Sequence, residues 1–386
     1  MPNVFVERSS TGLLGNLGNA IKGVLVGVLF FLASFPVLWW NEGRINFGKL
    51  AQGSVAVAPG APDASHDGQF VAVTDSLQSD AELGDSKYLR PGKYVALARR
   101  AESWAWVEKK ESKTTKNVGG GSDTETTYRY ETAWTSDPAD SSSFRHPEGH
   151  HNPPAREKSD QWLAEQATVG AFEFSPGDTD GGGFLGSGLP ASSRLELTPD
   201  LLTDGGHTAG GSECPHLVEG WIYLGTGTPS APAMGDTRIA YDALKPGGQV
   251  TLFGRQQGAR VEPFLVDAET PFLRAVSGPR DRAISEMLTE HSIETWILRG
   301  AGFLLMWLGL ALILGPISAV LDVLPFLGST SRTLVGIVMF PVALGLSGVT
   351  IVVSMIAHSL LALGIVMALV LSIGVLLIRG RKPRTA

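Results

Sequence analysis

Two blocks near the carboxyl end of this chain are almost free of charged side chains. Residues 300–321 contain no Asp, Glu, Lys or Arg, and residues 333–378 contain His358 as their single ionisable side chain. A bilayer core requires about 20 apolar residues per helix. The two blocks therefore predict three membrane-spanning helices, at residues 300–321, 333–356 and 358–378.

An apolar segment near the amino end, residues 21–40, predicts a fourth span, with Lys22 at its edge. This segment is longer than the apolar core of a secretory signal, about 7–15 residues, and it ends in Trp39 and Trp40 rather than in small residues of a cleavage site. We therefore expect a retained anchor, with a cleaved signal as the alternative. Tryptophans are common where a span meets the membrane interface. One large polar insert, residues 41–280, follows this span.

Basic residues predict how the chain is oriented. Residues 379–386 contain three arginines and one lysine directly after the last predicted span. Short basic flanks stay on the cytoplasmic side of a membrane. With four spans, the amino-terminal segment 1–20 and the loop 322–332 lie on that side as well. The insert is then exoplasmic, which means periplasmic, extracellular or lumenal.

The composition constrains the insert and its partners. The insert is long enough to bury a core of its own, and its lone cysteine, Cys214, excludes an intrachain disulfide. The domain is therefore expected to fold by packing alone. Cys214 is either a small buried residue or an intermolecular partner. The net charge of −7 excludes a broadly basic surface for nucleic acid.

The sequence of the insert predicts mainly β-structure. Aromatic, β-branched and Thr-rich runs alternate with glycine-rich turns, including a hairpin with its tip at 119–121. One helix is expected at residues 159–167. We expect an α+β or mainly antiparallel β domain in which two groups of strands form one sheet. The expected strands are residues 70–73, 93–98, 102–109, 126–134, 217–224, 237–241, 249–255 and 260–265.

Residues 281–299 have helical spacing of apolar side chains and contain no proline. They predict an amphipathic connector helix that continues into the span at 300–321 and couples the domain rigidly to the membrane. The connector lies on the domain or on lipid headgroups, or it binds a partner.

The densest group of potential metal ligands is His146, His150 and His151, in a proline-rich loop. Its spacing matches no common zinc pattern, so we expect loop histidines rather than a metal site. The glycine runs lack the Lys-Ser/Thr of a phosphate loop. Cys214 and His216 lie two positions apart, but this segment provides no acid that would orient the histidine as the base of a catalytic thiol. We therefore expect no enzyme activity, no cofactor, and no catalytic or metal-binding residues.

The predicted spans contain features of helix packing rather than of transport. Transporters and pumps ordinarily carry Asp, Glu, Lys or Arg within their spans, and these spans carry only Lys22, at the edge of the first one. Small residues at helical spacing allow close approach of helices, or they face lipid. Polar residues on the third span could instead line a conduit between protomers. The small residues are Gly23, Gly27, Gly364, Ala368 and Ser372, and the polar ones are Ser347, Thr350, Ser354 and His358.

Over essentially its whole length the chain resembles the transmembrane protein 43 (LUMA) family. The order and spacing of several short motifs carry the resemblance, together with the arrangement of one span before the insert and three after it. Of the three loop histidines, only His150 falls on the family pattern. The motifs are Asn41-Glu42-Gly43-Arg44, Leu97-x-Arg99-Arg100, Trp106-Val107-Glu108 with Glu111-Ser112, Tyr128-x-Tyr130 with Trp134, Gly149-His150-x-Asn152-Pro153, Gly235-Asp236-x-Arg238, Arg255-Gln256-x-Gly258 with Pro263-Phe264, and Thr295-Trp296-x-Leu298-Arg299-x-Ala301-Gly302.

The resemblance implies a multi-pass membrane organiser or scaffold that self-associates, with both ends in the cytoplasm and no established enzymatic activity. Its expected partners are membrane lipids, further copies of the chain, and unidentified membrane or exoplasmic proteins. An oligomeric channel or an exoplasmic ligand-binding sensor is the alternative. The glycine-rich loop at 203–211 and the Ala/Gly/Pro bias favour a bacterial member in the plasma (inner) membrane. A eukaryotic member would lie in the endoplasmic reticulum or inner nuclear membrane.

Overall fold

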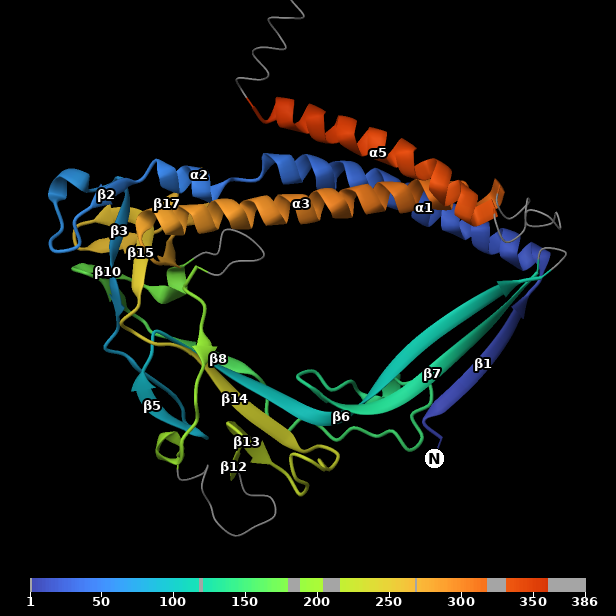
Figure 1. Cartoon of the computed structure of the whole chain (residues 1–386), viewed down its shortest axis with the longest axis horizontal. Helices are drawn as coiled ribbons and strands as arrows, with labels where there is room; N and C mark the ends of the chain where they lie inside the picture. The colour runs from blue at the N-terminus through green and yellow to red at the C-terminus, as the bar shows by residue number, and fades with distance from the viewer. Residues whose placement is uncertain are drawn as a thin grey trace, which may run out of the picture. The chain divides into compact units, whose positions relative to one another are not determined.

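The computed structural model describes residues 2–117, 121–179, 188–203, 216–267, 269–317 and 331–359. The chain divides into two compact units, each of which is built from several segments of the sequence (Figure 1). The first unit comprises Met1–Glu7, Asn46–Ser112 and Thr126–His291, and the second comprises Arg8–Ile45, Lys113–Glu125 and the chain from Ser292 onward. Cys214, the small residues at 364, 368 and 372, and nearly all of the span predicted at 358–378 lie outside the described residues.

The larger sheet contains eight strands in the order β1-β7-β6-β14-β13-β12, with β8 paired to β6 and β11 paired to β14. Its long hairpin, β6 and β7, begins in the first unit and ends in the second. The strands are β1 (Val4–Thr11), β6 (Ala96–Lys116), β7 (Ser122–Thr135), β8 (Asp160–Leu163), β11 (Ser193–Arg194), β12 (His216–Val218), β13 (Trp221–Leu224) and β14 (Thr237–Leu244).

The second sheet closes on itself. Its strand order is β19-β15-β16-β10-β9-β3-β2, and β15 also pairs with β3 along seven residue pairs, from Gln249 opposite Ser76 to Arg255 opposite Phe70. Five strands, β15, β16, β10, β9 and β3, therefore form a closed ring that leaves few free edges. The strands are β2 (Val55–Val57), β3 (Phe70–Gln78), β9 (Ala167–Val169), β10 (Phe172–Phe174), β15 (Gln249–Gln257), β16 (Arg260–Glu262) and β19 (Arg274–Ser277).

Short elements complete the first unit. The turn between β12 and β13 places Glu219 at φ 50° and Gly220 at φ 77°, the left-handed backbone of a tight two-residue hairpin turn. Two small hairpins pair β4 with β5 and β17 with β18. The remaining elements are β4 (Glu82–Asp85), β5 (Leu89–Lys93), β17 (Phe264–Leu265), β18 (Pro271–Phe272), helix α2 (Phe47–Gln52) and the 3₁₀ turns Ala64–His66, Ser141–Ser143, Pro176–Asp178 and Pro199–Leu201.

Each sheet has its own buried core. The closed sheet encloses aromatic and aliphatic side chains such as Phe172, Phe174 and Leu252, all fully buried. The larger sheet covers a separate cluster around Leu97, Ile239 and Tyr241. Burial of such side chains is the main stabilising contribution to a domain that lacks intrachain disulfides.

The predicted β domain is confirmed, with two corrections. Strands of both sequence groups pair with one another, but they form two principal sheets rather than one, with β3 beside β15 and β6 beside β14. The helix predicted at 159–167 is wrong, because these residues form β8 and the start of β9. Leu97 of β6 pairs with Trp162, and Arg99 pairs with Asp160. Pairing to the edge of β6 therefore overrides the local helix propensity of this segment.

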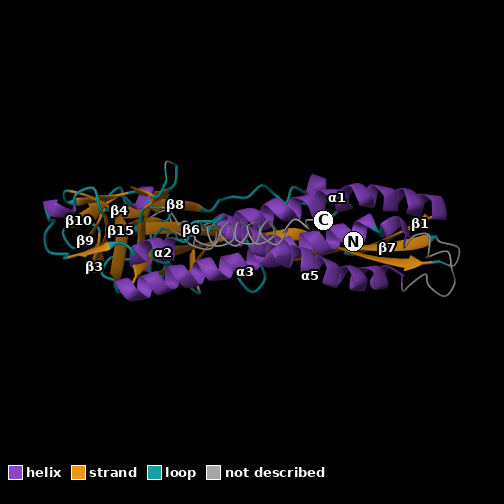
Figure 2. Cartoon of the chain, turned by 90° about the horizontal axis from the view of Figure 1, so that it is seen from above, coloured by secondary structure: helices purple, strands orange, loops and turns teal. Residues whose placement is uncertain are grey.

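Three long helices belong wholly or partly to the second unit: α1 (Leu13–Gly43), α3 (Arg280–Ile313) and α5 (Ser331–Ala357). Figure 2 shows them as long rods, in contrast to the strands that dominate the first unit. α3 is one uninterrupted helix that contains the expected connector and continues into the apolar block. α1 and α5 each contain one proline, Pro36 and Pro341.

The helices of the second unit pack through glycine and aromatic residues. A Cβ added at Gly27 would lie 2.8 Å from the carbonyl oxygen of Gly309, so the backbones of α1 and α3 approach closely, as small residues allow. Trp307 on α3 donates from Nε1 to the Gly336 carbonyl oxygen of α5 at 2.8 Å. Leu38, Met306 and Ala343 form the buried centre of this packing, one residue from each helix.

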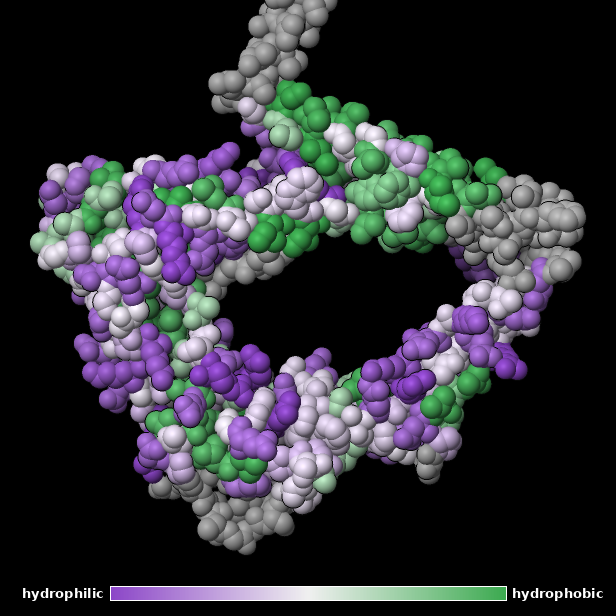
Figure 3. Space-filling model, viewed as in Figure 1, coloured by the Kyte–Doolittle hydropathy of each residue, from purple (hydrophilic) through white to green (hydrophobic). Residues whose placement is uncertain are grey.

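The remaining helix surface is apolar and exposed. Leu25 and Leu29 on α1 are 71% and 65% exposed, and many residues on α5 are similar. The surface over these helices is accordingly hydrophobic in Figure 3. Within the described residues, three helices are long and apolar enough to cross a membrane: Gly18–Gln52, Arg280–Ile313 and Leu334–Ala357. The chain is a membrane protein with one apolar helix before the β-rich domain and two after it among the described residues.

Candidate functional site

Six polar residues at the end of α1 and on α3 form a connected group. We call it the helix-end cluster. α1 ends at Gly43, where Arg44 turns the chain into extended backbone at ψ 143°. The last polar residues of α1 contact α3, which runs antiparallel to it. The cluster consists of Asn41, Glu42, Arg44, Glu294, Thr295 and Arg299.

Two ion pairs hold the cluster together. Arg299 donates from Nε and Nη2 to the two carboxylate oxygens of Glu42, each at 2.8 Å. Arg44 donates from Nη1 to Glu294 at 2.5 Å. Both carboxylate side chains are buried, with 6% of Glu42 and 2% of Glu294 exposed. Buried charges of this kind are tolerated only when they are paired.

The cluster also contains a link to the backbone. Asn41 is buried and donates from Nδ2 to the carbonyl oxygen of Thr295 at 3.2 Å. The motif at Asn41–Arg44 and the motif at Thr295–Arg299 therefore meet in space, although about 250 positions separate them. Both motifs belong to the residues that carried the family resemblance.

Aromatic side chains flank the cluster. The Arg44 guanidinium lies 5.7 Å from the Trp40 ring centroid, and the Arg299 guanidinium lies 5.1 Å from that of Trp296. Trp40 and Trp296 are more than half exposed. Exposed tryptophans beside arginines are typical of the polar boundary of a bilayer.

The end of α5 packs onto the same end of α1. Ser354 donates from Oγ to the Trp39 carbonyl oxygen at 3.1 Å, and the His358 ring lies 4.9 Å from the Trp39 ring. Gly43 is the residue that permits this approach, because an added Cβ would lie 2.5 Å from His358 Nε2. The arrangement fixes the ends of α1 and α5 and the middle of α3 relative to one another. Since each carboxylate already binds an arginine, the cluster is suited to holding helices rather than to proton transfer.

The polar residues of the stripe predicted on the third span form hydrogen bonds within the second unit. Ser347 and Thr350 donate to carbonyl oxygens of their own helix, those of Leu344 and Leu346. Ser354 is fully buried against α1. Within the second unit these residues therefore act as local hydrogen-bond donors and as contacts between helices.

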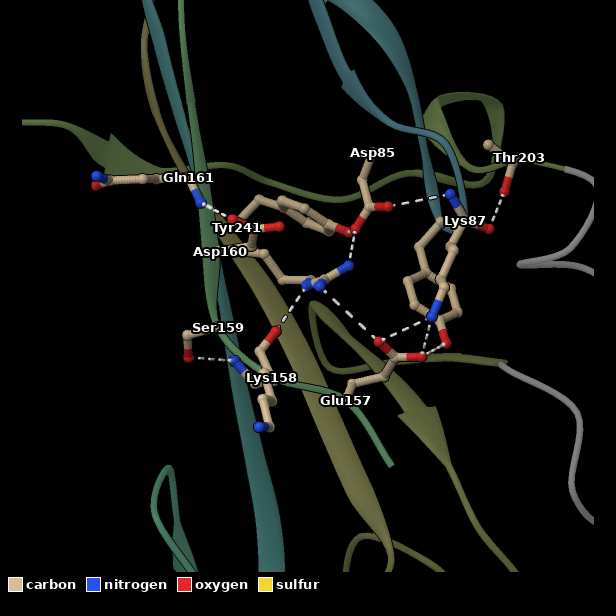
Figure 4. Close-up of polar contacts among 12 residues, drawn as sticks. Asp85, Lys87, Glu157, Lys158, Ser159, Asp160, Gln161, Thr203 and Tyr241 are labelled. Atoms are coloured by element: carbon tan, nitrogen blue, oxygen red, sulfur yellow. Dashed lines mark hydrogen bonds and ion pairs between the residues drawn. The ribbon is translucent and has the colours of Figure 1, made fainter. Parts of the chain in front are cut away.

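A second buried polar group, the Asp85 cluster, lies in the first unit (Figure 4). Asp85 Oδ2 accepts from Arg99 Nη1 at 2.5 Å and from the Tyr241 hydroxyl at 2.6 Å. Glu157 accepts from Lys87 Nζ at 3.0 Å and from the Tyr88 hydroxyl at 2.7 Å. The cluster ties the β4–β5 hairpin to β6 and β14 through charge-assisted bonds.

The tyrosines of the Asp85 cluster are hydrogen-bond donors. Burial raises the pKa of Tyr241 far above its ordinary value, and the hydrogen bond to Asp85 raises it further. Burial likewise raises the pKa of Tyr88, together with its bond to Glu157. Neutral tyrosines that donate to carboxylates stabilise the fold, and a phenol with a raised pKa is a poor general base at neutral pH.

The predicted histidine loop is a packing element. His150 is buried, its ring stacks on Tyr130 at 4.1 Å, and Nδ1 lies 3.1 Å from the carbonyl oxygen of His146. The His146 ring stacks on Phe5 at 4.2 Å, and His151 is exposed. Among the described residues there is no group of three His, Cys, Asp or Glu side chains that could hold a metal ion.

Asp236 has a structural role that its sequence motif did not predict. This buried carboxylate accepts backbone N–H groups from Thr226, Gly227 and Ala233, at 2.7 to 3.0 Å, and it also accepts the Tyr223 hydroxyl. It therefore shapes the loop between β13 and β14. Gly235 comes directly before it, with a φ of 83°. A glycine at this position is the sequence signal that indicates a turn.

Comparison with known proteins gives matches to one family. The family model described as transmembrane protein 43 matches residues 103–360. Transmembrane protein 43 from Homo sapiens is 29% identical over 349 residues, covering 84% of this chain and 81% of the human protein. The protein from Mus musculus is 28% identical over 81% of this chain and 79% of its own length, and a homolog from Drosophila melanogaster is 24% identical over 74% of each. No solved structure matches the chain.

Proposed function

Because this chain belongs to the transmembrane protein 43 family, we propose that it is a membrane scaffold that self-associates and presents its β-rich domain to partner proteins or lipids. The observation that carries the proposal is the helix-end cluster. It joins α1, which leads directly into the β-rich domain, to α3, which leaves it. The cluster therefore holds together the two helices that connect to the domain, as a scaffold requires.

The orientation of the domain follows from charge. The basic segment 379–386 lies in the cytoplasm, and the β-rich domain is exoplasmic. In a bacterium the host membrane is the plasma membrane, and in a eukaryote it is the endoplasmic reticulum or inner nuclear membrane.

Self-association has a testable surface on α5. An added Cβ at Gly345 or Gly348 meets nothing within 4 Å, so these positions are open on the isolated chain. A larger side chain there leaves the protomer intact and disturbs only a neighbour that approaches closely. Lipid alone supplies no hydrophobic driving force for such an approach, so packing contacts decide it.

The test measures the native mass of the full chain in lipid nanodiscs. The wild-type chain is expected to form oligomers, and a Gly345→Ile/Gly348→Ile variant is expected to shift toward the single protomer. Val353→Ile, at an exposed apolar position of the same helix, is the matched control and should retain the wild-type mass. A wild-type chain that remains a single protomer at all protein-to-lipid ratios would contradict self-association.

A further inference from the structure

The larger sheet buries one of its two faces in the first unit. Leu97 of β6 and Ile239 of β14 lie in the core cluster of this sheet. Because side chains alternate between the two faces of a strand, the residues between them in sequence, such as Arg100 and Arg238, point away from this core. We call this side the outer face. Its polar and aromatic residues are Arg100, Glu102, Trp134, Arg194, Trp221, Arg238 and Asp242, all in the first unit.

Tryptophan and arginine side chains stack along the outer face. The guanidinium groups of Arg194 and Arg238 each lie 4.2 Å from the ring centroid of Trp221. The Arg238 guanidinium also lies 4.5 Å from the ring centroid of Trp134. Tryptophan and arginine are the residue types that are enriched at protein interfaces and that carry most of their binding energy. The composition of the outer face is therefore typical of a surface that binds protein.

Positive charge is in excess at one end of the outer face. Glu102 accepts from Arg238 Nε at 2.7 Å. Asp242 accepts from Arg100 Nη2 at 2.9 Å and lies 3.9 Å from Arg194 Nη1, too far for a hydrogen bond. Burial lowers the pKa of Arg194, Asp242 offsets part of this effect, and Arg100 and Arg238 add to it. These contacts join three guanidinium groups to two carboxylates, and the exposed pair, Arg100 and Arg194, lacks a second anion.

A groove of about 580 Å³ with acidic walls lies in the same unit. Its charged lining residues are Asp80, Glu82, Glu165 and Glu173, and we call it the acidic groove. The Glu82 and Glu165 side chains are exposed, and in the described part of the chain they form no ion pair. Asp80 approaches Lys93 only at 3.8 Å, with both side chains largely exposed. Negative charge is therefore in excess in the groove.

The two regions of opposite charge lie close together. Leu163 of β8 lines the acidic groove and pairs with Ala96 of β6, and β8 lies beside β6 in Figure 1. Arg100 follows Ala96 by four residues on the same strand, which corresponds to about 13 Å at 3.3 Å per residue. A two-fold axis between the two regions would place the arginines of one copy opposite the groove of the other, twice.

We propose that the outer face and the acidic groove form a two-fold contact between the β-rich domains of two copies of this chain. Arg100 and Arg194 of each copy bind the Glu82 and Glu165 carboxylates of the other copy. This contact rests on the self-association proposed above and adds a second surface to the one on α5.

The charges favour a second copy over other occupants. An acidic peptide or an anionic lipid would compensate only the arginines, and it would be repelled by the groove beside them. A cation would compensate only the groove. A second copy compensates both regions at once, and complementary potentials of this kind determine the specificity of an interface. Leu163, which is 40% exposed, supplies apolar contact area beside the charged groups.

The first test crosslinks two differently tagged copies of the full chain in the membranes of cells that express both. In a Cys214→Ser background, one copy carries Ser192→Cys beside Arg194, and the other carries Gln78→Cys in the groove; both positions are exposed. A short bismaleimide is expected to link the two tags. Ala61→Cys, an exposed position outside both regions, is the matched control for Gln78→Cys. Equal yields for the test pair and the control pair would overturn the inference.

The second test reverses the charges. Arg100→Glu/Arg194→Glu in the Ser192→Cys copy is expected to lower the crosslinking yield at least about tenfold, since like charges then face each other. Glu82→Arg/Glu165→Arg in the Gln78→Cys copy should restore the yield, and this rescue excludes misfolding as the cause of the loss. Arg255→Glu, at a part-exposed arginine of the closed sheet, is the control and should leave the yield unchanged. A yield that ignores the reversal, or a loss without rescue, would overturn the inference.

The native mass in lipid nanodiscs separates this inference from the proposed function. Wild-type oligomers without a specific crosslink would leave self-association standing and would overturn the contact between domains. A wild-type chain that remains a single protomer would contradict both. Protection of the Ser192→Cys thiol by phosphatidylglycerol vesicles, without a crosslink, would assign the arginines to lipid and would also overturn the inference.

Discussion

Arg299 binds both carboxylate oxygens of Glu42 at 2.8 Å across 257 positions of sequence, and so links the end of α1 to the middle of α3. The pair is bidentate and mostly buried, with 20% of Arg299 and 6% of Glu42 exposed. A fork of two parallel N–H bonds fixes both distance and orientation. The pair therefore fixes the end of α1 against the middle of α3.

Glu42→Gln is expected to lower the free energy of unfolding by up to about 3 kcal/mol, because it leaves the Arg299 charge without a counter-ion in a largely buried site. Thermal unfolding of the full chain in detergent measures this loss. Glu262→Gln is the matched control, since Glu262 and its partner Arg255 are both more than one third exposed. Such surface pairs contribute about 0–1 kcal/mol. Equal losses for the two variants would show that the buried pair has no special structural role.

The crossing of α1 and α3 predicts a steric effect at Gly27. Gly27→Ala places a methyl group 2.8 Å from the Gly309 carbonyl oxygen, and overpacking of this kind costs about 1–3 kcal/mol. Gly345→Ala is the control, because nothing lies within 4 Å of its added Cβ and alanine favours a helix over glycine. The melting temperature should fall for the first variant and stay level or rise for the second. The opposite order would mean that the two helices do not approach at Gly27.

The apolar helices could be predicted from sequence because lack of charge over about 20 residues is a local signal. The helix-end cluster could not, since nothing near Glu42 indicates that its partner is Arg299. Their meeting depends on the antiparallel packing of α1 and α3, with Gly27 against Gly309. The family motifs include both Glu42 and Arg299, but the motifs do not indicate that the two side chains are in contact.

The strand β1 was missed for a similar reason. Val4–Thr11 is short, with apolar residues only in its first half, and it directly precedes a helix. Its partner β7 is more than 100 positions away, so pairing rather than propensity makes it a strand. The helix predicted at 159–167 fails in the same way, because the edge of β6 binds these residues as β8.

Tyr130 predicts a dependence of stability on alkaline pH. Burial raises its pKa to about 12, and the hydrogen bond to Glu108 adds to the effect. In the unfolded chain the phenol loses its proton near pH 10. Because the folded-state pKa is the higher one, the stabilisation is complete below about pH 10 and is lost as the pH rises toward about 12.

The measurement compares urea unfolding of the wild type and Tyr130→Phe over this pH range. The variant lacks the hydroxyl, so the stability difference between the two proteins should shrink as the pH rises from about 10 to about 12. Tyr88 and Tyr241 also have raised pKa values, and they contribute equally to both proteins. A difference that does not change with pH would contradict the assignment of the effect to Tyr130.

The histidine loop gives a final prediction, which separates packing from metal binding. The His150 ring is stacked on Tyr130 and meets the Trp106 ring edge-on, and its two nitrogens lie 3.1 Å from the His146 carbonyl oxygen and 3.4 Å from Asn3 Oδ1. His150→Ala removes a buried ring and is expected to cost about 3 kcal/mol.

His151→Ala, one position further along the loop, is the matched control. His151 is exposed, so its substitution should change stability by less than about 0.5 kcal/mol. A chelator should leave the melting temperature of the wild type unchanged, because both ring nitrogens of His150 already have protein partners. If the chelator lowers the wild-type melting temperature to that of His150→Ala, the loop is a structural metal site and the packing role assigned to His150 is wrong.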